Sequence, residues 1–159
     1  MRPAKDLEIR RDVRDAARVE SILRELSEWF GIEDALVDYV AKSMRLPNLA
    51  AMDGDRIVGI CLLSHHTKYA WEIDLLAVER ARHRLGIGSS LVAAAEADAM
   101  SHGVEFLQVK TLGPSMESSE YAATRLFYEA LGFRALEEIE GLWPGNPCLI
   151  LIKHLDPSV

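Results

Sequence analysis

The chain has 159 residues, of which 49% are hydrophobic and 27% are charged. This length fits one globular domain, and the composition excludes a disordered chain. Eighteen basic and 25 acidic residues give a net charge of −7, which disfavours a nucleic-acid partner. No apolar run approaches the ~18 residues that a membrane span needs, and the N-terminal twelve residues lack the apolar stretch of a signal peptide, so we expect neither feature.

Two cysteines bear on the compartment. Cys61 and Cys148 lie far apart in apolar runs and form no CxxC pair. This pattern favours two reduced core thiols in a cytoplasmic protein over a disulfide or a metal site.

The first part of the chain predicts one strand, two helices and a hairpin. Asp12 is a candidate N-cap for the first helix, and Pro47 ends the second. Asp53-Gly54 is a hairpin signal between two apolar strands. We therefore expect a strand at 7–11, helices at 13–30 and 33–44, and strands at 48–52 and 56–65.

The remainder alternates strands with helices. Gly103 and Gly132 are suited to end helices, and Ser118 to begin one. We expect a loop at 141–147 in the last hairpin, strands at 69–78, 105–111, 133–140 and 148–154, and helices at 86–102 and 119–131.

The element order is therefore βααβββαβαββ. Hairpin neighbours together with strand-helix-strand crossovers indicate an α+β (mixed α/β) fold. We expect a central mixed, mostly antiparallel sheet of about seven strands flanked by helices, within a single domain spanning 1–159.

The most informative segment follows the strand at 69–78. Gly86 and Gly88 lie where a turn opens a helix, and free amides at a helix start bind anions. An ordinary glycine-containing loop is the alternative. The sequence from Gly86 reads GIGSSL, which excludes GxGxxG, and no GK[ST] follows, which excludes a P-loop. Positive charge gathers beside the turn, at Arg80, Arg82, His83 and Arg84.

Three further side chains could carry chemistry. Glu72 and Asp74 share one face of a strand that is otherwise apolar. Either that face is solvated or the carboxylates have a task. Tyr128 lies in the helix that ends at Gly132, where packing is the alternative to a function.

Two motifs resemble the GNAT N-acetyltransferase superfamily. Residues 83–88, HRLGIG, resemble its acetyl-CoA-binding motif Q/R-x-x-G-x-G/A, with His83 at the first position. Residues 124–133, TRLFYEALGF, resemble the later helix of the family, which ends in an FYxxxGF-like pattern. The element order matches as well, so the resemblance covers essentially the whole chain and implies a GNAT-like acyl-CoA N-acyltransferase fold.

The resemblance implies acetyl-CoA as the co-substrate. We expect no metal, because the adjacent pair His65-His66 lacks the i,i+4 spacing of metal ligands. Backbone amides of Leu76 and Val78 would pair with its pantetheine arm as an added strand does. This chain has Tyr121 where many members carry Asn, and Thr124 where many carry Ala. Tyr121 or Thr124 would therefore make the polar contact from this helix to the pantetheine arm. The implied cofactor-binding residues are Leu76, Ala77, Val78, His83, Arg84, Leu85, Gly86, Ile87, Gly88, Ser89, Thr124 and Tyr128.

The implied reaction is direct attack of a primary amine, of a small molecule or a protein, on the acetyl thioester. An alkyl ammonium, with a pKa near 10.4, must first lose a proton to a base. Glu72 matches the base of some members, while Asp74 or water could serve instead, and Asp74 could hold the cationic acceptor. Tyr128 matches the tyrosine proposed to protonate the CoA thiolate.

Two other functions stay open: a non-catalytic acyl-CoA-binding sensor or interaction module on the same scaffold, and a nucleotide-binding protein that uses the same turn. A homodimer is common in the family. The exposed edge of the last hairpin is a candidate interface for it.

Overall fold

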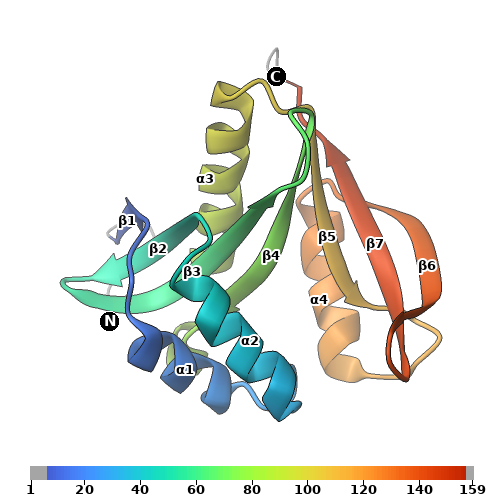
Figure 1. Ribbon diagram of the computed structural model, residues 1–159, viewed down its shortest axis with the longest axis horizontal. Coiled ribbons are helices and arrows are strands. Elements are labelled where there is room, and N and C mark those ends of the chain that lie inside the picture. Colours follow the sequence, from blue (N-terminus) through green and yellow to red (C-terminus); the bar gives the residue numbers. More distant parts are fainter. Residues whose placement is uncertain (1–6, 157–159) are drawn as a thin grey trace. The chain divides into compact units, whose positions relative to one another are not determined.

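Figure 1 shows the computed structural model, which describes residues 7–156. They fall into two compact units, residues 7–64 with 74–98 (unit 1) and residues 65–73 with 99–156 (unit 2). The elements are β1 (Glu8–Arg11), α1 (Ala16–Glu25), α2 (Glu33–Ser43), β2 (Asn48–Asp53), β3 (Arg56–His65), β4 (Ala70–Val78), the 3₁₀ turn η2 (Arg80–Arg82), α3 (Ile87–Ser101), β5 (Phe106–Leu112), α4 (Ser119–Ala130), β6 (Arg134–Trp143) and β7 (Asn146–His154).

The expected mixed sheet is confirmed. Its seven strands are hydrogen-bonded in the order β1-β2-β3-β4-β5-β7-β6. The β4–β5 pair is parallel, as a crossover through α3 requires, whereas β1–β2, β2–β3, β5–β7 and β6–β7 are antiparallel. The parallel register runs from Ala70↔Phe106 to Ile73↔Val109, entirely within unit 2.

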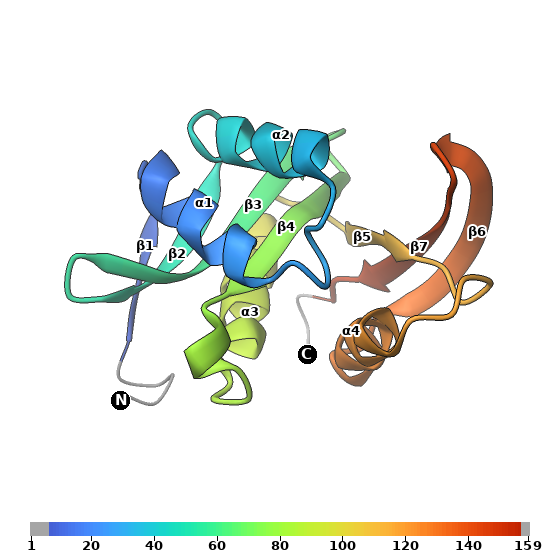
Figure 2. The same ribbon diagram turned by 90° about the horizontal axis from the view of Figure 1, so that it is seen from below.

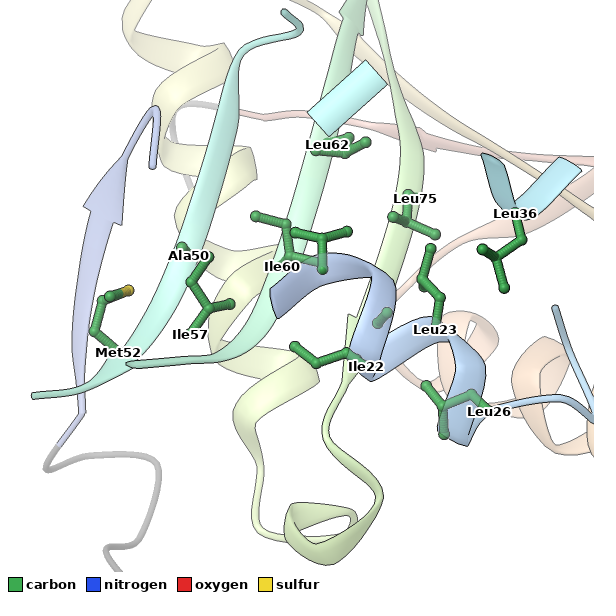
Figure 3. Close-up of a cluster of buried hydrophobic side chains, with 12 residues drawn as sticks. Ile22, Leu23, Leu26, Leu36, Ala50, Met52, Ile57, Ile60, Leu62 and Leu75 are labelled. Atoms are coloured by element: carbon green, nitrogen blue, oxygen red, sulfur yellow. The ribbon is translucent and has the colours of Figure 1, made fainter. Parts of the chain in front are cut away.

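Unit 1 has helices on both faces of its strands. Figure 2 shows α1 and α2 on one face and α3 on the other. The core beneath α1 and α2 joins strand residues to helix residues such as Ile22 and Leu23, both fully buried (Figure 3). Burying one such side chain contributes about 1.5–3 kcal/mol, so this apolar face accounts for the position of both helices.

The first helix is shorter than its periodicity predicts. Asp15, not Asp12, is the N-cap, and its side chain accepts the Arg18 N–H at 3.1 Å. Asp12 instead adopts a φ of 54° at the end of β1, and its carboxylate accepts the N–H of Asn48. The expectation for Asp12 was wrong because a residue from the next strand competes for its side chain. Residues 26–29, which the periodicity placed in this helix, form turns instead.

Unit 2 is built on β5, β7 and β6. The antiparallel β5–β7 register extends from Phe106↔His154 to Leu112↔Cys148. Helix α4 contacts β5. Ser118 caps α4 as expected, accepting the Tyr121 N–H at 3.2 Å. The start of α4 is thereby fixed by a local side-chain hydrogen bond.

The last hairpin is tighter than expected. The segment 141–147 was predicted as a loop, but β6 continues to Trp143 and β7 begins at Asn146, with these two residues paired. Pro144 and Gly145 alone form the turn, and Gly145 has a φ of 73°. Proline followed by a residue with positive φ is the pattern of a type II turn, which returns the chain in two residues.

Both cysteines are free and buried, as expected. Burial raises the pKa of the Cys61 thiol to about 12, so that this side chain behaves as a core residue. The single-domain expectation for 1–159 stays a prediction, because each unit is compact by itself.

Candidate functional site

The glycine turn of unit 1 joins η2 to α3. Arg84 and Gly86 have φ values of 63° and 85°, the left-handed region that glycine adopts without steric cost. The N–H of Ser90 bonds to the Gly86 carbonyl at 3.0 Å, which makes Gly86 the residue at the helix start. The three preceding N–H groups, of Ile87, Gly88 and Ser89, come before the first intrahelical bond. Helix geometry thus leaves three amides to face an anion.

Two of the cationic side chains beside this turn, Arg80 and Arg82, already contact acidic or carbonyl groups of the protein. The Arg80 guanidinium contacts the Glu28 carboxylate at 2.7 Å and the Glu25 carbonyl at 2.6 Å. Arg82 is buried and contacts Asp53 at 2.7 Å. These two arginines, part of the positive charge noted in the sequence, tie the turn to neighbouring segments. His83 and Arg84 remain.

His83 and Arg84 differ in their surroundings. The His83 Nε2 lies 2.7 Å from the Val78 carbonyl oxygen, and its ring makes an edge contact with Trp29. Arg84 is exposed, and its side chain has no ion-pair partner among residues 7–156. Arg84 is therefore the cation of this turn that stays available to a ligand.

A buried carboxylate, that of Glu79, binds three arginines just before the turn. Glu79, 7% exposed, accepts from Arg56 at 2.5 Å, Arg18 at 2.9 Å and Arg82 at 3.1 Å. Burial opposes the charge, but the hydrogen bonds and positive charges of Arg56 and Arg18 outweigh it and hold the pKa of Glu79 below its ordinary value. Three permanent cations on one carboxylate anchor the backbone between β4 and α3.

The end of β4 contains the residues expected to bind pantetheine. Leu76 and Val78 are half-buried and alternate with the buried Ala77, as the pleat requires. They lead directly into the glycine turn. The proposed pantetheine and pyrophosphate contacts are thus consecutive along the chain.

Asp74 is held by a lysine of α2. Its Oδ2 lies 3.3 Å from Lys42 Nζ, which also lies 3.1 Å from the carboxylate of Asp38. Burial lowers the pKa of Lys42, but Asp38 and Asp74 outweigh that effect, and the net shift is upward. A cationic acceptor at Asp74 would have to share it with this ammonium.

Glu72 belongs to unit 2 and is almost completely buried. Its side chain is 5% exposed, and its Oε1 lies 2.7 Å from His66 Nε2, 2.8 Å from Gln108 Nε2 and 3.3 Å from Lys110 Nζ. The alternative of a solvated face is wrong for Glu72. Sequence reasoning missed these partners, because only the β4–β5 register places Gln108 opposite Glu72.

Tyr128 and Thr124 lie on α4 of unit 2. The Tyr128 ring is 5% exposed and makes edge-to-face contacts with Phe127 and Phe133, with centroids 5.0 and 5.4 Å apart. The Thr124 hydroxyl donates to the Glu120 carbonyl at 3.2 Å. Burial raises the pKa of the neighbouring Tyr121. These contacts keep the packing interpretation of Tyr128 alongside the functional one.

A cavity of about 410 Å³ lies at the tip of the last hairpin. Its lining mixes one aromatic ring, two prolines and one carboxylate with glycines, a methionine and small polar residues: Ser115, Met116, Glu140, Gly141, Trp143, Pro144, Gly145, Asn146 and Pro147.

No helix between residues 7 and 156 combines the length and apolar character needed to cross a membrane. In the same part of the chain, no three His, Cys, Asp or Glu side chains gather as metal ligands would.

Known proteins match this chain over the region that includes the glycine turn. A family model described as an acetyltransferase (GNAT) domain matches residues 48–135, more than half of the chain. Over 91 residues the chain is 31% identical to blasticidin-S acetyltransferase from Streptomyces morookaense; this match covers 57% of the chain and 62% of that relative. The chain thus spans less than two thirds of the relative's length.

Solved structures share the fold. A GNAT-family protein from Desulfovibrio desulfuricans superposes with a TM-score of 0.80 at 22% identity, covering 94% of this chain and 99% of the other. A GNAT-family acetyltransferase from Elizabethkingia anophelis with acetyl-CoA bound superposes with a TM-score of 0.73 at 15% identity, covering 94% and 99%. These likenesses concern the fold.

Proposed function

Because the chain belongs to the GNAT acetyltransferase family, we propose that it transfers the acetyl group of acetyl-CoA to a primary amine. The observation that carries the proposal is the turn before α3, where Ile87, Gly88 and Ser89 present amides ahead of the first intrahelical bond. No acidic residue lies in the first turn of α3 to compete with an anion. Such a helix start suits the pyrophosphate of CoA.

The cofactor contacts follow from this placement. Residues 83–89 would hold the pyrophosphate, with Arg84 as the charged side chain and Gly86 allowing the backbone to approach. The half-buried end of β4, Leu76 to Val78, would pair with pantetheine. Thr124 would accept a hydrogen bond from the cofactor, because its own proton is directed at the Glu120 carbonyl.

The chemistry has three parts. The ammonium of the acceptor loses a proton, and Glu72 assists that step. The amine nitrogen then attacks the thioester carbonyl carbon, the C–N bond forms, and the C–S bond breaks. The thiolate takes a proton, for which Tyr128 is the proposed donor, since a neutral phenol can donate. The second proton, which the nitrogen loses as it becomes an amide, restores the phenol. Asp74 would attract the cationic acceptor.

The acceptor, the compartment and the assembly belong to the same proposal. The name of the Streptomyces morookaense relative makes blasticidin S the first acceptor to test. Two free, buried cysteines support a cytoplasmic protein. Strand β6 ends the strand order with mostly exposed residues, which supports a homodimer through that edge.

A second candidate is a non-catalytic acyl-CoA-binding module. The burial of Glu72 and Tyr128 favours it, because both groups would have to reach reacting atoms.

One experiment separates the two candidates. CoA release is measured with acetyl-CoA and a panel of blasticidin S, a linear polyamine and a peptide with a free N-terminus, while calorimetry measures CoA binding. Turnover of any amine supports the transferase. Tight CoA binding without turnover supports the module, and equal competition by ATP supports the nucleotide-binding alternative.

A further inference from the structure

The buried carboxylate of Glu72 contacts a histidine, His66, whose side chain is more exposed to solvent. His66 Nε2 lies 2.7 Å from Glu72 Oε1, yet the His66 side chain is 45% exposed while that of Glu72 is 5% exposed. The carboxylate thus lies behind the imidazole. A substrate arriving from solvent meets the ring before it meets Glu72.

The turn between β3 and β4 fixes the backbone of His66. The His66 N–H donates to the Ala70 carbonyl at 3.1 Å, and the Thr67 hydroxyl oxygen accepts from the amides of Tyr69 and Ala70 at 3.1 Å. The turn therefore restrains the backbone of His66, and the carboxylate restrains its ring. Such restraint orients an imidazole for proton transfer.

The carboxylate also selects the tautomer. An ionised carboxylate only accepts hydrogen bonds, so the Nε2 of His66 carries a proton, and in the neutral imidazole the lone pair is then on Nδ1. Within residues 7–156 Nδ1 has no hydrogen-bond partner. The charged groups at this cluster are Glu72 on β4 and Lys110 on β5, and Gln108 contributes a neutral amide.

We propose that His66 is the group that takes the proton from the acceptor ammonium, and that Glu72 is the positioning residue that orients it. This role rests on the proposed acetyl transfer. The ammonium N–H bond breaks and its proton passes to Nδ1, giving an imidazolium and a neutral amine. The amine forms the C–N bond to the acetyl carbon, the C–S electrons leave with the CoA sulfur, and the thiolate takes up the second proton that the nitrogen loses as it becomes an amide. The imidazolium then releases its proton to water.

Glu72 is a poorer direct acceptor than His66. Three donors surround its Oε1, and its side chain is closed to solvent. An alkyl ammonium could therefore use only Oε2, which belongs to a side chain that is 5% exposed. The Nδ1 of the exposed His66 ring requires no such entry into the protein.

The test uses His66→Gln and His66→Ala, with His154→Gln as the matched control. His154 is another exposed histidine of unit 2, on β7. With an acceptor that the wild type turns over, His66→Gln is expected to lower kcat by about 10² or more and to remove the acidic limb of the pH profile. CoA affinity and the melting temperature should stay unchanged. Added imidazole should restore part of the activity of His66→Ala.

Nuclear magnetic resonance of the histidine rings supplies a readout independent of turnover. The wild type should show the Nε2–H tautomer of His66, and Glu72→Gln should mix the tautomers. Full activity and an unchanged pH profile in His66→Gln would overturn the role of His66 alone. An Nδ1–H tautomer in the wild type would overturn it as well. Absence of turnover by the wild type on every amine would overturn the proposed function, and this role with it.

Discussion

Strand β4 and its extension carry two buried glutamates whose partners differ in kind. Glu79 of unit 1 is surrounded by three guanidinium groups, which stay charged at any pH a protein tolerates. Glu72 of unit 2 is surrounded by an imidazole, an amide and an ammonium. Permanent cations hold a backbone in place, whereas an imidazole can gain and lose a proton near neutral pH. This difference supports the proposals that Glu79 serves structure and that Glu72 serves the chemistry.

The largest expected effect is that of Glu72→Gln on turnover. Removing the charge should lower kcat by about 10²- to 10⁴-fold, with the greatest loss at low pH, where free amine is scarce. Steady-state rates across pH would show it. Glu105→Gln, an exposed carboxylate of the same unit, is the control and should keep the wild-type profile. A wild-type pH–rate profile in Glu72→Gln would remove Glu72 from the mechanism.

Glu79→Gln should act on stability rather than on chemistry. It leaves three guanidinium groups without their shared anion, which should cost roughly 3 kcal/mol of unfolding free energy. Denaturant unfolding measures this. Glu33→Gln removes an exposed partner of Arg24 and should change little. An unchanged unfolding midpoint in Glu79→Gln would contradict the structural role.

The contribution of Glu79 to stability should also depend on pH in the acid range. Since the folded pKa of Glu79 lies below its ordinary value of 4.5, its contribution is present above the unfolded pKa and is lost as the pH falls through the folded pKa. The wild type should therefore lose stability below about pH 4.5 more steeply than Glu79→Gln does. If the melting temperatures of the two proteins fell by the same amount as the pH was lowered, this role of Glu79 would be wrong.

Gly88→Val tests the anion site that Glu79 supports. A side chain in the first turn of α3 should block the approach of the pyrophosphate and weaken CoA binding by about tenfold or more, roughly 1.4 kcal/mol. Calorimetry on the folded variant measures the affinity. Unchanged affinity would place the pyrophosphate elsewhere.

Tyr128→Phe carries the smallest expected effect. Phenylalanine keeps the ring contacts with Phe127 and Phe133 and removes only the hydroxyl. We expect kcat to fall by about tenfold, at the weak end of general-acid contributions because a thiolate leaves readily. Acetyl-CoA affinity and melting temperature should stay nearly constant. A lower melting temperature with normal turnover would instead make Tyr128 a structural hydroxyl.

Much of the fold could be predicted because its signals are local. The hairpin at Gly54, the cap at Ser118 and the helix ends at Gly103 and Gly132 each depend on residues within a few positions. Asp12 shows where this reasoning fails, because Asn48, 36 residues away, competes for its side chain. The glycine turn could also be predicted, since consecutive residues form it.

The order of the elements and the position of the glycine turn could be predicted from the sequence, because periodicity, caps and turns act over short distances. Which charges remain available depends on how the chain folds. Arg80 and Arg82 find Glu28 and Asp53, 52 and 29 residues away. Glu72 finds Gln108, 36 residues away, through the register of two parallel strands. A charge is free or paired according to what folding brings beside it, and strand pairing joins segments whose spacing in the sequence carries no such signal.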